Sequence, residues 1–159
     1  MHEVSVTREI DAPKTAIWQV LDDFGGVDKY NPGITRSGIV DGPDTGRGAT
    51  RECLLNDGGR IEEEIIEYES GSSYTVEFTD MGEFPLKENI VRISVTELDT
   101  SRTNVTMAAR FTPKFGPLGW LMAKVMMKSR FEENFEGMLA GLEAHVKTGR
   151  HGATESVPN

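Results

Sequence analysis

Residues 118–146 read LGWLMAKVMMKSRFEENFEGMLAGLEAHV, a proline-free run of helix-forming residues that follows Gly116-Pro117. At about 1.5 Å per residue, one helix over this run is on the order of 40 Å long, the span of a small domain. Its first half is apolar on nearly every side, interrupted by Lys124 and Lys128. A helix of this kind needs a concave apolar partner. We therefore expect the residues before it to form a curved sheet that grips it.

The preceding 110 or so residues carry the alternation expected of such a sheet. A first strand over Val4–Ile10 is followed by two short helices, at Ile17–Phe24 and Val27–Tyr30. Six further strands, separated by short turns, are predicted at 35–41, 49–55, 60–69, 73–79, 86–98 and 103–112. This order predicts an α+β fold in which a seven-stranded curved antiparallel sheet wraps around a long C-terminal helix. We expect Gly149 to end that helix, residues 1–148 to form one domain, and residues 149–159 to be a disordered tail.

Composition narrows the classes of protein to consider. A net charge of −9 argues against a nucleic-acid partner, because phosphate recognition needs a basic surface. The single cysteine, Cys53, excludes an internal disulfide and a multi-cysteine zinc site, and we expect no metal. The start of the chain has no signal segment, and the most apolar window, 118–127, is shorter than the ~20 residues that cross a bilayer. We expect a soluble cytoplasmic protein without stable membrane insertion, either a monomer or a homodimer.

An ordered series of short motifs carries a family resemblance. They are Ile17-Trp18-x-Val20-Leu21-x-Asp23-Phe24-Gly25-Gly26, Tyr30-Asn31-Pro32, Gly48-Ala49-Thr50-Arg51, Asp57-Gly58-Gly59-Arg60-Ile61-Glu62-Glu63, Met81-Gly82-x-x-Pro85-Leu86 and Phe111-Thr112-Pro113. Over about residues 3–147 the series resembles the START/birch-pollen-allergen (SRPBCC) superfamily, most closely its polyketide cyclase/dehydrase-like branch. The resemblance implies a helix-grip fold that binds a hydrophobic small molecule, such as a lipid, a polyketide or another aromatic or isoprenoid-like compound, in an internal cavity. Two alternatives stay open: a polyketide cyclase/dehydratase that uses the same cavity, and a co-chaperone-like protein-interaction module.

Strand parity predicts which residues line the inner face, since alternate residues face the helix. The resulting wall is apolar except at four positions, Arg8, Arg51, Glu63 and Asn89, all of which we expect to be substantially buried. Mostly apolar walls with a few polar groups are typical of ligand pockets. Arg51 and Glu63 lie on adjacent predicted strands, so they either pair structurally or bind a ligand.

The candidate ligand-binding residues follow from this parity map, from the predicted mouth and from the aromatic and methionine residues of the long helix. They are Arg8, Tyr30, Arg51, Glu63, Phe78, Phe84, Asn89, Met107, Trp120, Met127 and Phe131. The resemblance implies a mouth where the turn at residues 31–33, the 81–85 loop and the start of the last helix meet, flanked by Tyr30, Phe84 and Trp120. The methionines either adapt the pocket to varied ligands or fill an ordinary core.

Catalysis is left open by the sequence. The three histidines lie near the ends of the chain or of the last helix, and no zinc-ligand spacing, nucleophile–base set or phosphate-binding glycine loop is present. If the protein is an enzyme, Glu63 is the best acid or base and Arg51 would stabilise an enolate or carboxylate. Tyr30 or Tyr74 could then donate a proton. We expect Cys53 to be inert and no cofactor to be needed.

Overall fold

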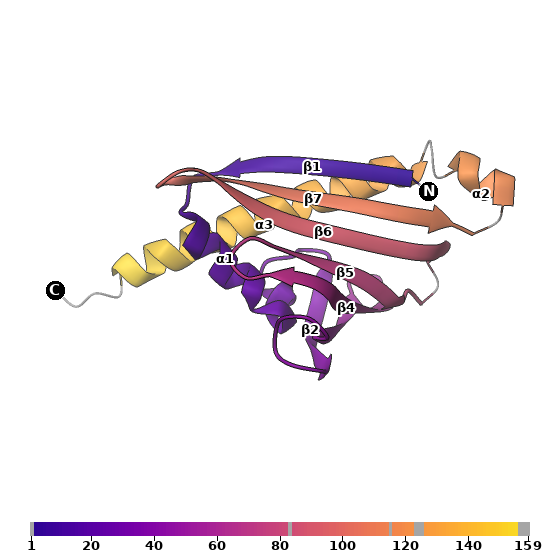
Figure 1. The fold of residues 1–159 in the computed structure, drawn as a ribbon, viewed down its shortest axis with the longest axis horizontal. Coiled ribbons are helices and arrows are strands. Elements are labelled where there is room, and N and C mark those ends of the chain that lie inside the picture. Colours follow the sequence, from indigo (N-terminus) through magenta and orange to yellow (C-terminus); the bar gives the residue numbers. More distant parts are fainter. Residues whose placement is uncertain (1, 83, 115, 123–125, 156–159) are drawn as a thin grey trace.

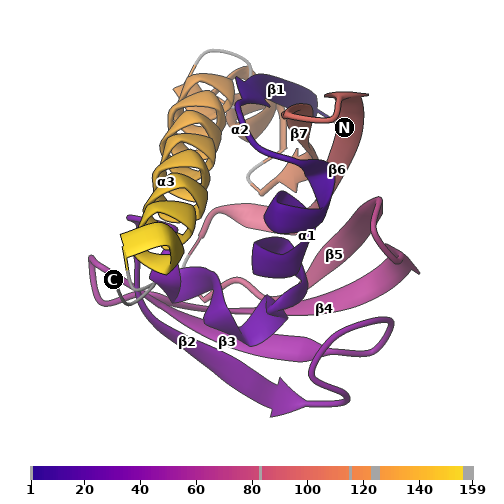
Figure 2. The same ribbon diagram turned by 90° about the vertical axis from the view of Figure 1, so that its left-hand side faces the viewer.

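Seven strands form one curved antiparallel sheet, and a long helix lies across its inner side (Figures 1 and 2). The computed structural model describes residues 2–82, 84–114, 116–122 and 126–155. In chain order the elements are β1 (His2–Ile10), α1 (Lys14–Asp22), the 3-10 helix η1 (Phe24–Lys29), β2 (Ile34–Asp41), β3 (Thr50–Leu55), β4 (Arg60–Glu69), β5 (Ser73–Asp80), β6 (Leu86–Asp99), β7 (Arg102–Pro113), α2 (Gly116–Met122) and α3 (Lys128–Glu155). The predicted strands are confirmed to within one or two residues.

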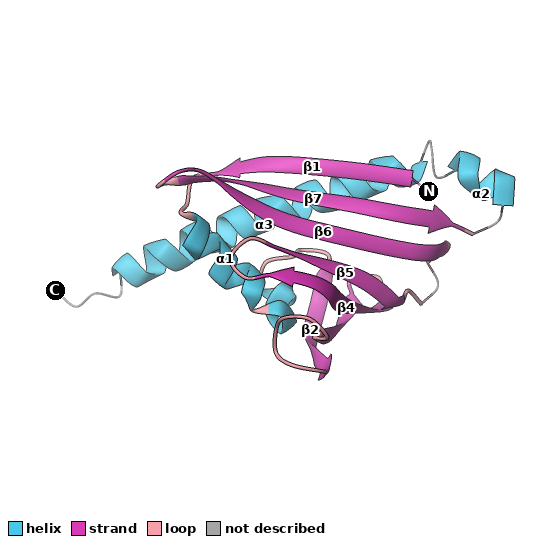
Figure 3. Cartoon of the chain, viewed as in Figure 1, coloured by secondary structure: helices cyan, strands magenta, loops and turns pink. Residues whose placement is uncertain are grey.

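The order of strands in the sheet is β1-β7-β6-β5-β4-β3-β2. Each strand from β2 to β6 pairs with the next one along the chain, and β7 also pairs with β1. Strands β1 and β2 therefore form opposite edges, and α1 and η1 carry the chain between them on the same side of the sheet as α3 (Figure 3). The predicted α+β helix-grip architecture is confirmed.

The core lies between the inner face of the sheet and the helices. Its sheet side is built from alternate residues, as the parity map predicts: Val4, Ile10, Cys53, Ile61, Ile65, Tyr74, Val76, Val91, Ile93, Val95, Val105, Met107, Ala109 and Phe111 are all buried. From α3, Phe135, Leu139, Leu142 and Val146 are buried at spacings of three or four residues, which places them along one face of the helix.

The C-terminal helical region differs from the prediction in two ways. The single predicted helix from Leu118 is instead two helices, α2 and α3, and α2 lies beyond the end of the sheet (Figure 1). With no sheet beneath it, α2 leaves Leu118 66% and Leu121 55% exposed, so the expected apolar partner is missing there. At the other end, α3 continues through Gly149 to Glu155, and the prediction that Gly149 ends it is wrong. Gly149 lacks the positive φ of a helix-ending glycine; the tail residues 156–159 lie outside the described part.

Candidate functional site

Arg51 and Glu63 form a buried ion pair on the inner face. They are direct cross-strand partners on β3 and β4, and each is 4% exposed. Both Nη2 and Nε of Arg51 donate hydrogen bonds to Glu63 Oε2, at 2.6 and 3.1 Å. The remaining Nη1 donates to the backbone oxygen of Phe24 at 3.0 Å, and the guanidinium lies 4.0 Å from the centre of the Phe24 ring. The pair therefore links β3, β4 and η1, which is the structural role that the sequence left open.

Phe24 was not identified as part of this site from the sequence. It is 27 residues from Arg51 along the chain, and it contacts the guanidinium because η1 lies beneath the sheet. No local pattern could have signalled this, since an inward Phe at the end of a short helix is ordinary core.

Two tyrosines surround the ion pair. Tyr30, at the end of η1, is 6% exposed, and Tyr74, on the inner face of β5, is 3% exposed. Burial is the main reason that the pKa of each phenol is raised, and Arg51, Glu63 and the other tyrosine are close enough to act on it as well. Both hydroxyls are therefore neutral at physiological pH. Among the described residues, the Tyr74 hydroxyl is buried without a hydrogen-bond partner.

Cys53 lies two residues from Arg51 on the same strand face and is fully buried. Burial raises the pKa of its thiol to about 12, and Glu63 adds to this effect more than Arg51 opposes it. The thiol therefore stays protonated near neutral pH, which agrees with the prediction that Cys53 is inert.

Asn89 is the other buried polar group of the inner face. It is 2% exposed on β6, and its Oδ1 has no hydrogen-bond partner among the described residues. Its cross-strand partner is Phe111 of β7, whose ring stacks on Phe131 of α3 at 4.6 Å between centroids. The same Phe111 ring lies 5.4 Å from His2 of β1. Asn89 thus presents a hydrogen-bond acceptor within an aromatic part of the interior.

Arg8 departs from the prediction that it would be substantially buried. Its side chain is 41% exposed, and Nη2 lies 2.8 Å from Oε1 of Glu143 on α3. The parity is as predicted, but β1 is an edge strand and the side chain is long enough to reach the flank of the helix. Arg8 therefore ties α3 to the edge of the sheet instead of lining the interior.

At one end of the domain, inward-facing apolar residues are only partly buried. Leu55 and Phe78 follow the parity of Cys53 and Val76, yet both are part-exposed, as are Met127 and Phe131 where α3 begins. Leu55 and Phe78 lie toward the C-terminal ends of β3 and β5, two strands that run in the same direction. Met127 and Phe131 lie where α3 begins. Among the described residues, the inner face is therefore only partly covered at this end, which we call the open end.

The remaining candidates divide between this open end and the core. Phe84 and Trp120 are exposed at the open end, at 40% and 48%. Met107 is buried at 4% within the core. Tyr30, expected beside the mouth, instead lies buried against α3, with its ring 6.4 Å from His145.

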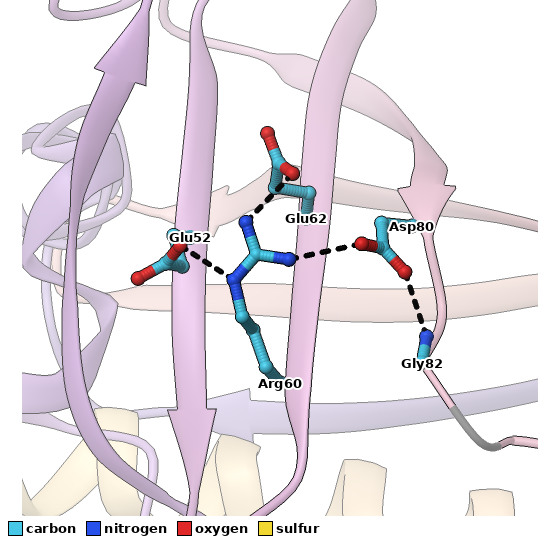
Figure 4. A network of polar contacts seen from close by, with 5 residues as sticks. All are labelled: Glu52, Arg60, Glu62, Asp80 and Gly82. Atoms are coloured by element: carbon cyan, nitrogen blue, oxygen red, sulfur yellow. Dashed lines mark hydrogen bonds and ion pairs between the residues drawn. The ribbon is translucent and has the colours of Figure 1, made fainter.

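The outer face of the sheet carries a separate charged network centred on Arg60 (Figure 4). Its guanidinium contacts Glu52 at 2.6 Å and both Glu62 and Asp80 at 2.9 Å, joining β3, β4 and β5. The other Asp80 oxygen accepts the Gly82 backbone N–H at 2.8 Å, the main reason that the pKa of this carboxyl is lowered. Glu62 thus faces solvent while its neighbour Glu63 faces the core.

Within residues 2–82, 84–114, 116–122 and 126–155, no cluster of three or more His, Cys, Asp or Glu could hold a metal ion. Across the described helices, none combines the length and apolar character needed to cross a membrane.

Comparison with known families gives one match that covers nearly the whole chain. Residues 1–147 match the family described as polyketide cyclase / dehydrase and lipid transport. No curated protein matches the sequence.

Several solved structures share the fold at low sequence identity. A START superfamily protein from Mycobacterium smegmatis is 20% identical with a TM-score of 0.77, over 93% of this chain and 99% of that one. A protein from Thermus thermophilus is 19% identical with a TM-score of 0.73, over 93% and 99%. Norcoclaurine synthase from Thalictrum flavum, solved with dopamine and hydroxybenzaldehyde, is 15% identical with a TM-score of 0.71, over 92% and 87%. At these identities the likeness is one of fold.

Proposed function

Because this chain belongs to the polyketide cyclase / dehydrase and lipid transport family, we propose that its domain binds a hydrophobic small molecule between the sheet and α3. Members of one fold family differ in chemistry, so the support has to come from the interior of this chain.

The observation that carries the proposal is the partly open end of the inner face. Leu55, Phe78, Met127 and Phe131 are apolar and face the interior, yet solvent reaches them, while the same strand faces are fully buried farther along. Apolar side chains left half-covered in the mouth of a fold gain free energy when an apolar ligand covers them, at roughly 25 cal/mol per Å² of area removed from water. A ligand with an apolar body fits this end of the domain.

The polar groups of the interior narrow the class of ligand further. Arg51 and Glu63 satisfy each other, so they are not free to bind an ionic ligand. The Oδ1 atom of Asn89 is buried and unpartnered within the described structure. Buried polar atoms normally find a partner, and this one accepts hydrogen bonds. We therefore assign to the ligand a hydroxyl or N–H group that reaches Asn89, on an otherwise apolar and at least partly aromatic body that packs against Phe111 and Phe131.

Cyclase or dehydratase chemistry is the second candidate, and one feature favours it. The Tyr74 hydroxyl is protonated, unpartnered among the described residues and close to Arg51, so it could donate a proton or hydrogen bond to a ligand carbonyl. Tyr74→Phe removes this hydroxyl alone and so separates the two roles. An enzyme loses turnover of a poly-β-ketone while keeping its affinity; a carrier shows at most a change in affinity.

The test of binding is native mass spectrometry of gently purified protein, followed by organic extraction. We expect a reproducible adduct, or a mass gain on adding fatty acids or aromatic polyketides. Leu55→Trp fills the open end and should reduce the adduct, while Val40→Trp, which adds the same ring at a 51% exposed position on β2, should leave it unchanged. A clean apo mass with no gain on addition would refute the proposal and favour a protein-interaction module.

A further inference from the structure

The two edge strands of the sheet differ in how they are protected. Strand β1 is held against α3 by the Arg8–Glu143 ion pair, and its exposed Glu3 and Glu9 already pair with arginines of β7. Within the described part of the chain, β2 pairs only with β3, and it forms the lower rim of the molecule in Figure 2. An unguarded edge strand of this kind is a template for pairing with a further strand.

The free edge of β2 presents the backbone groups of Ser37 and Ile39. The Leu55 N–H of β3 donates to a backbone oxygen of the β3–β4 turn at 2.8 Å, so Leu55 bonds toward β4. Backbone groups alternate in direction along an antiparallel strand, so Glu52 bonds toward β2, where its cross-strand partner is Gly38. Gly38 therefore bonds to β3. Its neighbours Ser37 and Ile39 point their N–H and C=O groups away from the sheet.

The 3-10 helix η1 holds this edge in place from the inner side. Ser37 Oγ donates to the Gly25 backbone oxygen at 2.8 Å and accepts the Asp28 backbone N–H at 3.0 Å. Both contacts use the Ser37 side chain and leave its backbone groups unused. Among the described residues, no turn or loop backbone bonds to the N–H of Ser37 or Ile39. The edge is therefore ordered and available for pairing.

Two opposite charges flank the centre of β2. Arg36 and Asp41 are exposed, and within the described residues neither has an ion-pair partner. A bulge at Val40 turns Asp41 to the outer face of the sheet, which Arg36 and Gly38 share. Arg36 and Asp41 are about 15 Å apart along the strand, too far to pair within one copy.

We propose that two copies of this chain pair edge to edge through antiparallel β2 strands, with the two-fold axis at Gly38. Ser37 of each copy then exchanges backbone hydrogen bonds with Ile39 of the other. Arg36 of each copy lies beside Asp41 of the other, so the two opposite charges are compensated on both sides of the axis. The sheet becomes continuous across the dimer.

The self-complementarity of β2 favours a second copy over an unrelated extended segment. A two-fold axis at Gly38 sets the residues before it in one copy against the residues after it in the other, and these two halves carry opposite charges. Gly38 also leaves a hollow of about 160 Å³ on the outer face, lined in part by Glu52 and Leu54, which gives the crossing Arg36 side chain room. The pairing uses no residue of the open end, so its test is independent of ligand binding.

Sedimentation equilibrium of the full chain measures the association. We expect a reversible dimer in the micromolar range, because an edge-strand contact lies at the small end of protein interfaces. Gly38→Glu places two carboxylates at the axis, whereas within one copy its Cβ meets open space. It should weaken the dimer at least about 100-fold. Arg36→Glu should weaken it at least about tenfold, and adding Asp41→Arg to that variant reverses both charges and should restore most of the affinity.

A matched control and a second measurement locate the contact. Ser5→Glu adds the same carboxylate to an exposed position on β1, the other edge, and should leave the dimer unchanged. In hydrogen exchange, the Ser37 and Ile39 amides should be protected in the dimer and exchange faster in Gly38→Glu. Circular dichroism and thermal unfolding check that each variant is folded.

Three results would overturn the pairing proposal. One is a wild-type protein that stays monomeric up to about 0.5 mM. Another is a dimer that Gly38→Glu leaves intact. The third is a reversal of Arg36 and Asp41 that fails to restore the association lost in Arg36→Glu. Failure of ligand binding alone, seen as a clean apo mass with normal sedimentation, would refute the proposed function and leave the pairing intact.

Discussion

Replacing Arg51 by Met leaves the Glu63 carboxylate without its cation at a position that is only 4% exposed. The variant loses two hydrogen bonds to Glu63 and the one to the Phe24 carbonyl, and Met fills most of the space of the lost side chain. Glu63→Leu produces the converse, an uncompensated guanidinium. Breaking a buried pair by removing one partner typically costs about 3–5 kcal/mol. We therefore expect each single variant to unfold about 3–5 kcal/mol more easily than the wild type.

The double variant Arg51→Met with Glu63→Leu removes both charges. An apolar replacement of a buried pair is often neutral or stabilising, but here the Phe24 carbonyl still loses its donor, which costs about 1–3 kcal/mol. The double variant should therefore be more stable than either single variant. The two substitutions should couple by about 3 kcal/mol or more in a double-mutant cycle.

Urea unfolding followed by circular dichroism measures all four proteins. At a slope of about 2 kcal/mol per M, a loss of about 4 kcal/mol lowers the midpoint by about 2 M. Single variants that lose less than about 1 kcal/mol, or losses that simply add in the double variant, would refute the structural role. Intact stability combined with lost ligand binding would instead assign the pair to the ligand.

Three further predictions concern the contact of α3 with Tyr30, the two buried tyrosines and Asn89. Gly141→Ala places a Cβ against the Tyr30 backbone oxygen, so we expect a net loss of about 1–3 kcal/mol. Gly137→Ala, one turn earlier, places its Cβ in ordinary contact with Pro32 Cγ at 3.9 Å and should gain up to about 1 kcal/mol. Equal effects in urea unfolding would contradict the contact of Gly141 with Tyr30. Because burial raises the phenol pKa of Tyr30 and Tyr74, the folded state is favoured below about pH 10 and loses stability above it, where the unfolded chain ionises. In a Tyr68→Phe background, which removes the part-exposed third tyrosine, absorbance at about 295 nm should show ionisation of Tyr30 and Tyr74 only together with unfolding. A step near pH 10 with unchanged circular dichroism would contradict this. Asn89→Leu removes an unpaired acceptor, so it should stabilise the free protein by about 1 kcal/mol. The same substitution should lower the affinity for a hydroxylated ligand about tenfold, as measured by calorimetry. A destabilised variant with unchanged affinity would show that Asn89 is structural.

Much of the site could be predicted from alternation alone. Arg51, Glu63 and Asn89 were placed inside because each shares the parity of apolar neighbours on its strand, and all three are buried. Arg8 has the same parity and is not buried, because burial at an edge strand depends on what covers it. The partner of Arg8 is Glu143, 135 residues away, and no local pattern announces that pair.

The sequence by itself determined the strands, the two short helices and the inner and outer faces, because side-chain alternation and turn residues act over a few neighbours. Its ordered series of motifs also determined the family. Only the tertiary structure decided where the C-terminal helices lie, that α2 stands beyond the sheet with its leucines exposed, and that α3 continues to Glu155. It also decided that Tyr30 is covered by α3 and that Phe24 supports Arg51. These features rest on contacts between segments far apart in the chain, whose free energy is set by the packing of whole elements and leaves no period in the sequence.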